Sequence, residues 1–221
     1  MGGEGKNGRM YDMFRHRVIF PVFDTNGEVV AFSGRRLNDN EEERKYINTS
    51  DTPVFKKSKI LFGMNIAKNT ESGTLILCEG APDAIAMHQA GFDNAIATLG
   101  TAITPDQARI FAKYTKKVVI CYDSDKAGQN AAQKAMRLLG EVGIDVRVIK
   151  LGGAKDPDEY IKAFGADKFR EVISGAKSKF EYNLESLLSK YDINLPQDKI
   201  NALKECEKLI SEVYSKAEQD I

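Results

Sequence analysis

The sequence predicts an α/β fold: a parallel sheet flanked by helices, with a small β-rich subdomain before it and a helical tail after it. From residue 74 to residue 165, short apolar runs alternate with helical segments over short connections. The apolar runs are continuous, which is typical of strands that helices cover on both faces. With 221 residues, of which 42% are hydrophobic and 29% charged, the chain can bury a sizeable core.

A small β-rich subdomain is predicted for residues 1–70. Two β-favouring runs, residues 17–24 (RVIFPVFD) and 28–34 (EVVAFSG), flank Asn26-Gly27, a dipeptide typical of hairpin turns. The following residues, 38–60, are polar and irregular in pattern. We expect them to form a long surface loop that carries basic and amide side chains.

The parallel sheet is predicted for residues 71–165. Thr104 suits a helix N-cap and Pro105 the first helical position, while Gly143 suits a helix end. The expected strands are residues 74–79, 94–100, 117–123 and 145–151, and the expected helices are residues 82–91, 104–114, 127–143 and 156–165.

The last predicted unit, residues 166–221, is rich in Lys, Glu and Leu and is expected to be all-helical. Apolar residues such as Ile200, Leu203 and Ile210 recur at helical spacing. We interpret this pattern as a helix that packs on the domain or on a neighbour, and not as a site of chemistry.

The cysteines and the overall charge exclude some classes of protein. The sequence has three cysteines, Cys78, Cys121 and Cys206, and none of them forms a C-x-x-C pair. With only two histidines, a structural zinc site is disfavoured, and the odd number of cysteines disfavours a disulfide scaffold. We expect Cys78 and Cys121, which end apolar runs, to be buried thiols. The absence of a signal peptide or membrane-spanning stretch indicates a cytoplasmic protein with no membrane partner. The net charge of zero neither requires nor excludes nucleic acid.

Acidic residues follow the ends of three predicted strands. Glu79 ends the first strand, Asp123 and Asp125 follow the third, and Asp156 and Asp158 follow the fourth. In an open parallel sheet these ends meet at one edge, where ligands bind. Two carboxylates about 4 Å apart repel by roughly 4 kcal/mol at an effective dielectric near 20. A bound Mg²⁺ or Mn²⁺ would offset this repulsion, and such sites usually accept substrate phosphate.

Helix capping is the competing interpretation of these acids. For Asp123 and Asp125 alone, capping and metal binding are about equally favoured. Glu79 shifts the balance to metal binding, because glutamate is a weak N-cap and Asp83 supplies another acid nearby. For Asp156 and Asp158, in the sequence Asp-Pro-Asp, capping and function both stay open. The sequence contains no P-loop, dinucleotide fingerprint or recognisable Ser-His-Asp arrangement, and His88 lies inside a predicted helix.

Three motifs and their flanks resemble a known family. The motifs are EGAPD at 79–83, ATLGTA at 97–102 and DSDKAG at 123–128, which are similar to the TOPRIM fold. The flanking stretches YDMFRHRVIFPVFDTNGEVVAFSGRRL and KYINTSDTPVFKKSKILFG resemble the RNA polymerase core of bacterial DnaG-type primases. The resemblance runs from about residue 9 to about residue 170, and more weakly through the tail.

The resemblance implies metal-dependent synthesis of short RNA primers on single-stranded DNA from ribonucleoside triphosphates. It implies catalytic and metal-binding roles for Glu79, Asp123 and Asp125, with Asp156, Asp158 and Asp83 as further metal candidates. A replicative helicase is the partner that it implies for the full-length protein. Basic and amide residues that would line the path of template and nucleotide are Arg15, Arg17, Arg35, Lys45 and Asn48.

The chain departs from the family pattern in three ways. Ala81-Pro82 stands where the family usually has Tyr-Met, so the packing beside Glu79 must differ. The zinc-binding domain and the first part of the polymerase core are not evident, and neither is the helicase-binding domain, so we expect either a fragment or a divergent primase. The alternatives are TOPRIM strand cleavage, although no tyrosine lies in a recognisable nucleophile motif, and a degenerate nucleic-acid or replisome-binding module. A D-x-D phosphohydrolase is disfavoured, because Lys126-Ala127 follows the motif.

Overall fold

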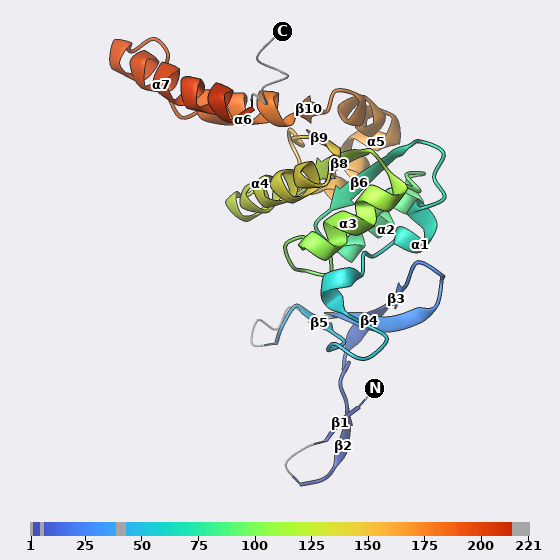
Figure 1. The fold of residues 1–221 in the computed structure, drawn as a ribbon. Coiled ribbons are helices and arrows are strands. Elements are labelled where there is room, and N and C mark those ends of the chain that lie inside the picture. Colours follow the sequence, from blue (N-terminus) through green and yellow to red (C-terminus); the bar gives the residue numbers. More distant parts are fainter. Residues whose placement is uncertain (1, 5–6, 39–42, 214–221) are drawn as a thin grey trace.

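The computed structural model describes residues 2–4, 7–38 and 43–213. Its centre is a five-stranded sheet with the order β10-β9-β8-β6-β7, in which the four strands β6 to β9 run parallel (Figure 1). The prediction of a parallel sheet is therefore confirmed. The strands are β6 (Thr74–Cys78), β7 (Ala95–Ala97), β8 (Lys117–Cys121), β9 (Asp145–Val148) and β10 (Lys177–Ser178).

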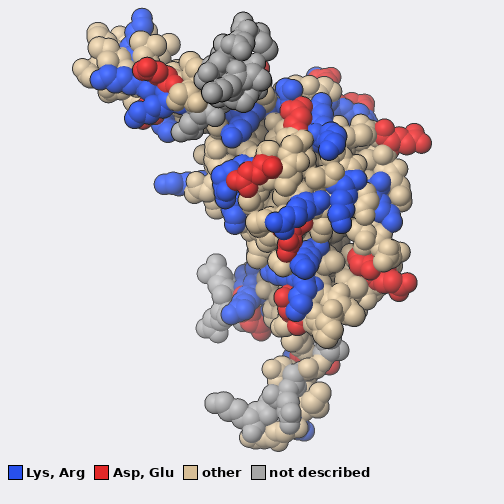
Figure 2. Space-filling model, in the orientation of Figure 1, with Lys and Arg blue, Asp and Glu red and all other residues tan. Residues whose placement is uncertain are grey.

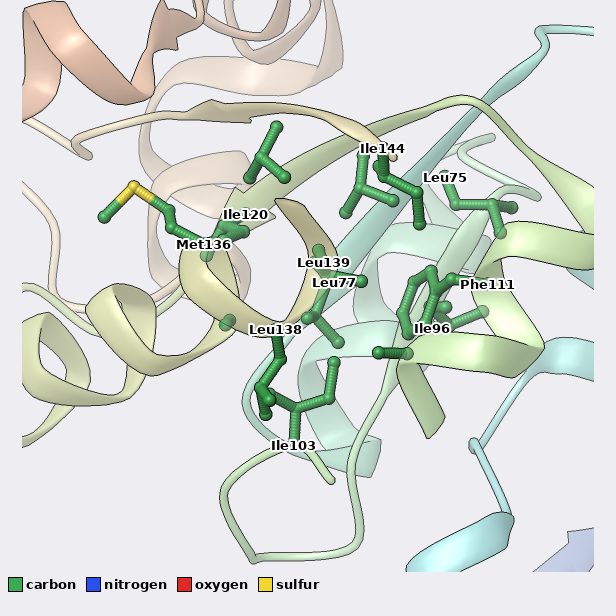
Figure 3. Packing of buried hydrophobic residues seen from close by; sticks show 14 of the residues in the cluster. Leu75, Leu77, Ile96, Ile103, Phe111, Ile120, Met136, Leu138, Leu139 and Ile144 are labelled. Atoms are coloured by element: carbon green, nitrogen blue, oxygen red, sulfur yellow. The ribbon is translucent and has the colours of Figure 1, made fainter. Parts of the chain in front are cut away.

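Helices cover both faces of this sheet, because successive side chains of each strand point to opposite faces. Leu75 and Leu77 of β6 pack into the cluster beneath α3 and α4, whereas Ile76 and Cys78 pack into the cluster beneath α2 and α5. Figure 3 shows part of the first cluster, where Phe111 lies beside side chains from the sheet. The helices are α1 (Met64–Ala67), α2 (Ala81–Gln89), α3 (Pro105–Tyr114), α4 (Lys126–Glu141) and α5 (Pro157–Ser174).

The predicted cap of α3 is confirmed. The backbone N–H of Gln107 donates to Thr104 Oγ1 over 3.1 Å, and the backbone N–H of Thr104 donates to Gln107 Oε1 over 3.0 Å. This reciprocal pair satisfies two N–H groups that the helix itself leaves unpaired. The buried amide of Gln107 also donates to the carbonyl of Ile60, so the cap fastens α3 to the preceding segment.

The N-terminal part forms an antiparallel sheet with the order β3-β4-β5, and its hairpin is confirmed. The expectation of an irregular loop over residues 38–60 was wrong in part. Tyr46 and Asn48 pair with Arg35 and Ser33, so this stretch supplies a third strand to the open edge of β4. Residues 39–42 of that stretch lie outside the described residues. The elements are β3 (Arg17–Phe23), β4 (Val29–Arg36), β5 (Tyr46–Asn48) and a 3₁₀ turn (Lys57–Lys59), after a projecting ribbon of β1 (Gly2–Glu4) and β2 (Met10–Asp12) (Figure 1).

A small apolar cluster joins the two sheets. Val22 and Ala31 of the β3–β4 hairpin pack with Phe55, which is 0% exposed, and with Leu99, which follows β7. The backbone of Phe62 also exchanges two hydrogen bonds with Ala97, of 2.9 and 3.0 Å. The N-terminal sheet is thereby held against the carboxyl end of the parallel sheet.

The expectation of an all-helical tail was wrong. Lys177 pairs with Val148, so β10 adds an antiparallel edge strand to β9 before the two tail helices begin. This pairing occupies backbone groups at an edge that would otherwise stay open. Helix α5 also continues past its expected end, bending at Gly165, whose φ is 84°. The tail helices are α6 (Lys179–Leu188) and α7 (Pro196–Val213).

The thiols behave as the sequence predicts. Cys78 and Cys121 are buried in the cluster beneath α2 and α5, and all three cysteines are free. Among the helices of the described residues, none is both long enough and apolar enough to cross a membrane. On the face drawn in Figure 2, Lys and Arg side chains are interspersed with Asp and Glu.

Candidate metal centre

A cavity of about 400 Å³ opens between the two sheets, at the carboxyl ends of β6 and β8. One wall comes from the parallel sheet and is acidic, and the other comes from β4 and β5 and is basic and polar. We call these the acidic wall and the basic wall. The acidic wall contains Glu79, Asp83, Asp123, Asp156 and Asp158 together with Lys155, and the basic wall contains Ser33, Arg35, Lys45, Tyr46 and Asn48.

Glu79 and Asp123 form a carboxyl pair at the floor of this cavity. They are brought together because Cys78 of β6 lies opposite Cys121 of β8, so both chains leave the sheet at the same level. Burial, and then the charge of Asp123, raises the pKa of Glu79. Burial, and then the charge of Asp156, raises the pKa of Asp123. Each of the two carboxyl groups therefore influences the titration of the other.

This pair fits a hard divalent cation. Within the described part of the chain, no three carboxylate, imidazole or thiolate groups converge to form a ready-made metal cage. Mg²⁺ does not need one, because it commonly takes one or two carboxylates and completes its shell with water and substrate phosphate. A cation here would favour the ionised form of both carboxyl groups and so offset the burial that raises both pKa values.

Asp83 also lines the cavity, and its titration is dominated by burial. Its Oδ2 accepts a hydrogen bond of 3.0 Å from the backbone N–H of Gly80, which fixes the first turn of α2. Burial raises the pKa of Asp83 to about 7, and the charges of Asp123, Asp156 and Glu79 add to the increase. The residue therefore supports the loop that carries Glu79, and near neutral pH it is only partly ionised.

The raised pKa of Asp83 predicts an unusual pH dependence for the metal-free protein. A carboxyl group with a raised pKa in the folded state binds its proton more tightly there than in the unfolded chain, so its stabilisation is lost as pH rises from about 4 to 7. Asp83→Asn should therefore stabilise the protein at pH 8 by about 2 kcal/mol, or roughly 4–8 °C in Tm, and much less at pH 4.5. Thermal unfolding in EDTA across pH measures this.

Asp167→Asn is the matched control, because the Asp167 side chain is 96% exposed. Its Tm should follow that of the unsubstituted protein at every pH. Parallel curves for Asp83→Asn and the unsubstituted protein would contradict a raised pKa at Asp83.

Of the aspartates that had two open interpretations, Asp125 and Asp156 act as caps. Asp125 Oδ1 accepts the N–H of Gly128 at 2.7 Å, and Asp156 Oδ1 accepts the N–H of Glu159 at 2.8 Å. Each cap uses one carboxylate oxygen, so capping does not exclude a second role. Asp156 and Asp158 line the cavity, with Asp158 ion-paired to Lys162 at 2.6 Å. Asp125 is not among the lining residues, although its charge contributes to the raised pKa of Glu79.

The structure divides the basic residues into two groups. Arg35, Lys45 and Asn48 line the cavity, and Asn48 Nδ2 donates to the carbonyl of Leu99 over 3.2 Å. Arg17 instead donates to the carbonyl of Arg44 over 2.9 Å, and its side chain is only 3% exposed. Arg15 lies over the ring of Tyr11, at 5.6 Å from the centroid, and lines separate hollows.

Sequence reasoning missed three polar side chains that line the cavity. Lys155 brings a positive charge to the acidic wall, where it opposes the rise in the pKa of Asp123. Tyr46 hydrogen-bonds with Arg35, and Ser33 lies on the same face of β4. The position of Lys155 directly before Asp156 was a usable signal. The sequence offered no such signal for Tyr46 and Ser33, because the pairing of β5 with β4 was not predicted.

Comparison with known proteins gives two family matches. Residues 76–161 match the family described as Toprim-like, and residues 2–68 match the N-terminal domain of the DNA primase catalytic core. The DNA primase of Clostridium acetobutylicum is 41% identical over 209 residues, which are 94% of this chain and 35% of that protein. The chain thus spans about a third of the length of the curated relatives it matches.

Solved structures agree with these matches. The E. coli primase catalytic core aligns with a TM-score of 0.79 and 32% identity, over 96% of this chain and 69% of that one. The RNA polymerase domain of Mycobacterium tuberculosis primase, in complex with a double-stranded DNA oligomer with a 6-nucleotide overhang, aligns with a TM-score of 0.84 and 27% identity, over 100% and 71%.

The parallel sheet with its strand-end acids, set against a β-rich N-terminal part, defines the TOPRIM-containing catalytic core of a primase. The chain belongs to the bacterial DnaG-type DNA primase family.

Proposed function

We propose that this chain is the catalytic part of a primase, which joins ribonucleotides into short primers on single-stranded DNA with the help of Mg²⁺ or Mn²⁺. The observation that carries this proposal is the carboxyl pair of Glu79 and Asp123, which faces Arg35, Lys45 and Asn48 across one cavity. Metal-bound triphosphate and the anionic template both require this combination of acidic and basic walls.

The reaction forms a bond from the 3′-oxygen of the growing primer to the α-phosphorus of the incoming nucleotide, while the bond to pyrophosphate breaks. Metal ions, when bound, would neutralise the triphosphate and lower the pKa of the attacking hydroxyl. Glu79 and Asp123 would hold the metal, and Glu79 is also the candidate for taking the proton. The other acids near the pair would add negative charge; they are Asp125, Asp156, Asp158 and Asp83. Asp125 and Asp156 would also hold the starts of their helices in place, and Asp83 the turn that follows Glu79.

The basic wall supplies the contacts to nucleic acid in this proposal. Lys45 is exposed and lines the cavity, so its ammonium group is accessible to phosphate. Arg35 is oriented by Tyr46, and Lys155 offers a further cation beside the carboxyl pair. Contacts to phosphate carry little sequence information, so we expect binding to depend steeply on salt and weakly on sequence.

Lys45→Ala should weaken binding to single-stranded DNA and lower the salt slope of log K by about 0.7, the share of one phosphate contact on a single strand. Fluorescence anisotropy between 50 and 200 mM salt measures both. Lys204→Ala, at an exposed position of α7 away from the cavity, is the control and should leave the slope unchanged. An unaltered salt slope for Lys45→Ala would show that Lys45 does not contact the DNA phosphates.

The decisive experiment for the function is the joining of labelled ribonucleotides on single-stranded DNA, with and without Mg²⁺ or Mn²⁺. Metal-dependent extension supports the proposal. Cleavage of the DNA without extension would indicate the strand-cleaving alternative, and binding without either reaction would indicate a non-catalytic module.

A replicative helicase and a cytoplasmic location are proposed for the full-length protein only.

A further inference from the structure

Gly128, in the first turn of α4, lies against the backbone of Asp123. A Cβ atom at this glycine would stand 2.2 Å from the carbonyl oxygen of Asp123, 3.0 Å from its carbonyl carbon and 3.2 Å from its nitrogen. Distances under 3.0 Å are not tolerated, and backbone atoms cannot rotate away as the end of a side chain can. Among the described glycines, no other would bring a Cβ so close to backbone atoms.

The backbone conformation does not explain this glycine. Gly128 lies within a regular helix and has no positive φ, so an alanine there would be favoured by local helix propensity. What requires glycine is the space that the side chain of any other residue would take from Asp123. Glycine is a poor helix former, but here it allows the helix backbone to approach the backbone of Asp123 closely.

The turn is also fixed to the strand end by hydrogen bonds. The N–H of Gly128 donates to Asp125 Oδ1 over 2.7 Å, and the N–H of Gln129 donates to the carbonyl of Asp125 over 3.0 Å. The Gln129 side chain donates to the carbonyl of Ser124 over 3.2 Å. Residues 123–129 therefore form one rigid loop-to-helix unit.

We propose that Gly128 is a positioning residue for metal binding: its lack of a side chain lets the first turn of α4 hold the Asp123 peptide at the place where its carboxylate meets Glu79. This inference rests on the proposed function, in that it assigns the carboxyl pair to a metal. It adds the residue that sets the pair's geometry without touching metal or substrate.

The test compares Gly128→Ala with Gly140→Ala in the same helix, where a Cβ would meet no atom within 4 Å. Mg²⁺ is titrated while thermal unfolding is followed, and a bound ion raises Tm. Gly128→Ala should raise the half-saturating Mg²⁺ concentration at least tenfold and reduce primer extension at least 100-fold, with partial recovery in Mn²⁺. Gly140→Ala should keep the Mg²⁺ midpoint within twofold and have an equal or higher metal-free Tm. A Gly128→Ala protein with an unchanged Mg²⁺ midpoint would overturn the proposal.

A second pair of variants covers the case in which Gly128→Ala does not fold. Ala127→Gly loosens the same turn without adding an atom, and Lys134→Gly makes a comparable change at an exposed position in the middle of α4. Both should lower the metal-free Tm by similar amounts, and only Ala127→Gly should raise the Mg²⁺ midpoint, by severalfold. Equal midpoints would overturn the proposal. If the unsubstituted protein shows no Mg²⁺-dependent stabilisation, the metal assignment fails instead.

Discussion

Replacing Glu79 by glutamine is expected to abolish primer extension, with a loss of at least about 10³-fold, or roughly 4 kcal/mol in the activation free energy. Glutamine keeps the size of the side chain but can neither neutralise a metal ion nor take a proton. The fold should survive, because glutamine keeps the shape of the side chain and removes a carboxyl group whose pKa is raised by burial and by the charge of Asp123. Steady-state extension and thermal unfolding in EDTA measure the two effects separately.

Glu71→Gln provides the matched control, because Glu71 is exposed and precedes the opposite end of β6. It should extend primers at the unsubstituted rate. Asp123→Asn should behave like Glu79→Gln, and the double variant should lose little more than either single variant, since residues that act as a unit are not additive. Full activity in Glu79→Gln would disprove the assignment of the carboxyl pair.

The second large effect is expected from Phe55→Ala. Phe55 is fully buried between the β3–β4 hairpin and Leu99, so truncation should cost about 3–5 kcal/mol of unfolding free energy. The same cluster holds the basic wall against the acidic wall, and Asn48 bonds to the carbonyl of Leu99. We therefore expect KM for ribonucleotide to rise at least tenfold, while the Mg²⁺ midpoint stays unchanged.

Phe111→Ala separates the loss of stability from the loss of alignment. Phe111 is also 0% exposed, but it packs in the cluster beneath α3 and α4, away from the basic wall. Its truncation should cost a similar unfolding free energy in urea denaturation and leave KM within about twofold. If both variants change KM equally, the small cluster does not align the walls.

The parallel sheet was predictable because its signals are local and agree with one another. Continuous apolar runs predicted β6 and β8, and the Thr104 cap predicted the start of α3, which the structure confirms. The edge strands carried no such signal. Only three residues form β5 and only two form β10, and both are strands because a neighbouring strand offers an open edge. That pairing is a tertiary effect that propensity does not contain.

The gathering of acids at one edge of the sheet was predictable to a similar degree. Acids at two strand ends predicted that Glu79 and Asp123 lie in one place, because the topology of a parallel sheet brings such ends together, whereas their role in metal binding stays a prediction. The basic residues were less certain from sequence alone, since a positive charge does not reveal where its side chain lies. Arg17 illustrates this, because three backbone carbonyls surround its guanidinium group and bury it beneath residues 43–45. Arg35 and Lys45, by contrast, line the cavity.

The alignment of Cys78 with Cys121 has a consequence for how the gene can vary. Side chains alternate along a strand, so a deletion of one codon within β8 would shift every later residue and turn Asp123 away from Glu79. The connection between α6 and α7 carries no such constraint, because it joins two tail helices outside the cavity. Insertions and deletions should therefore survive in natural variants of residues 190–195 and be absent from residues 74–79 and 117–123. Sequencing a library of random single-codon deletions, selected for primer synthesis, would show this contrast.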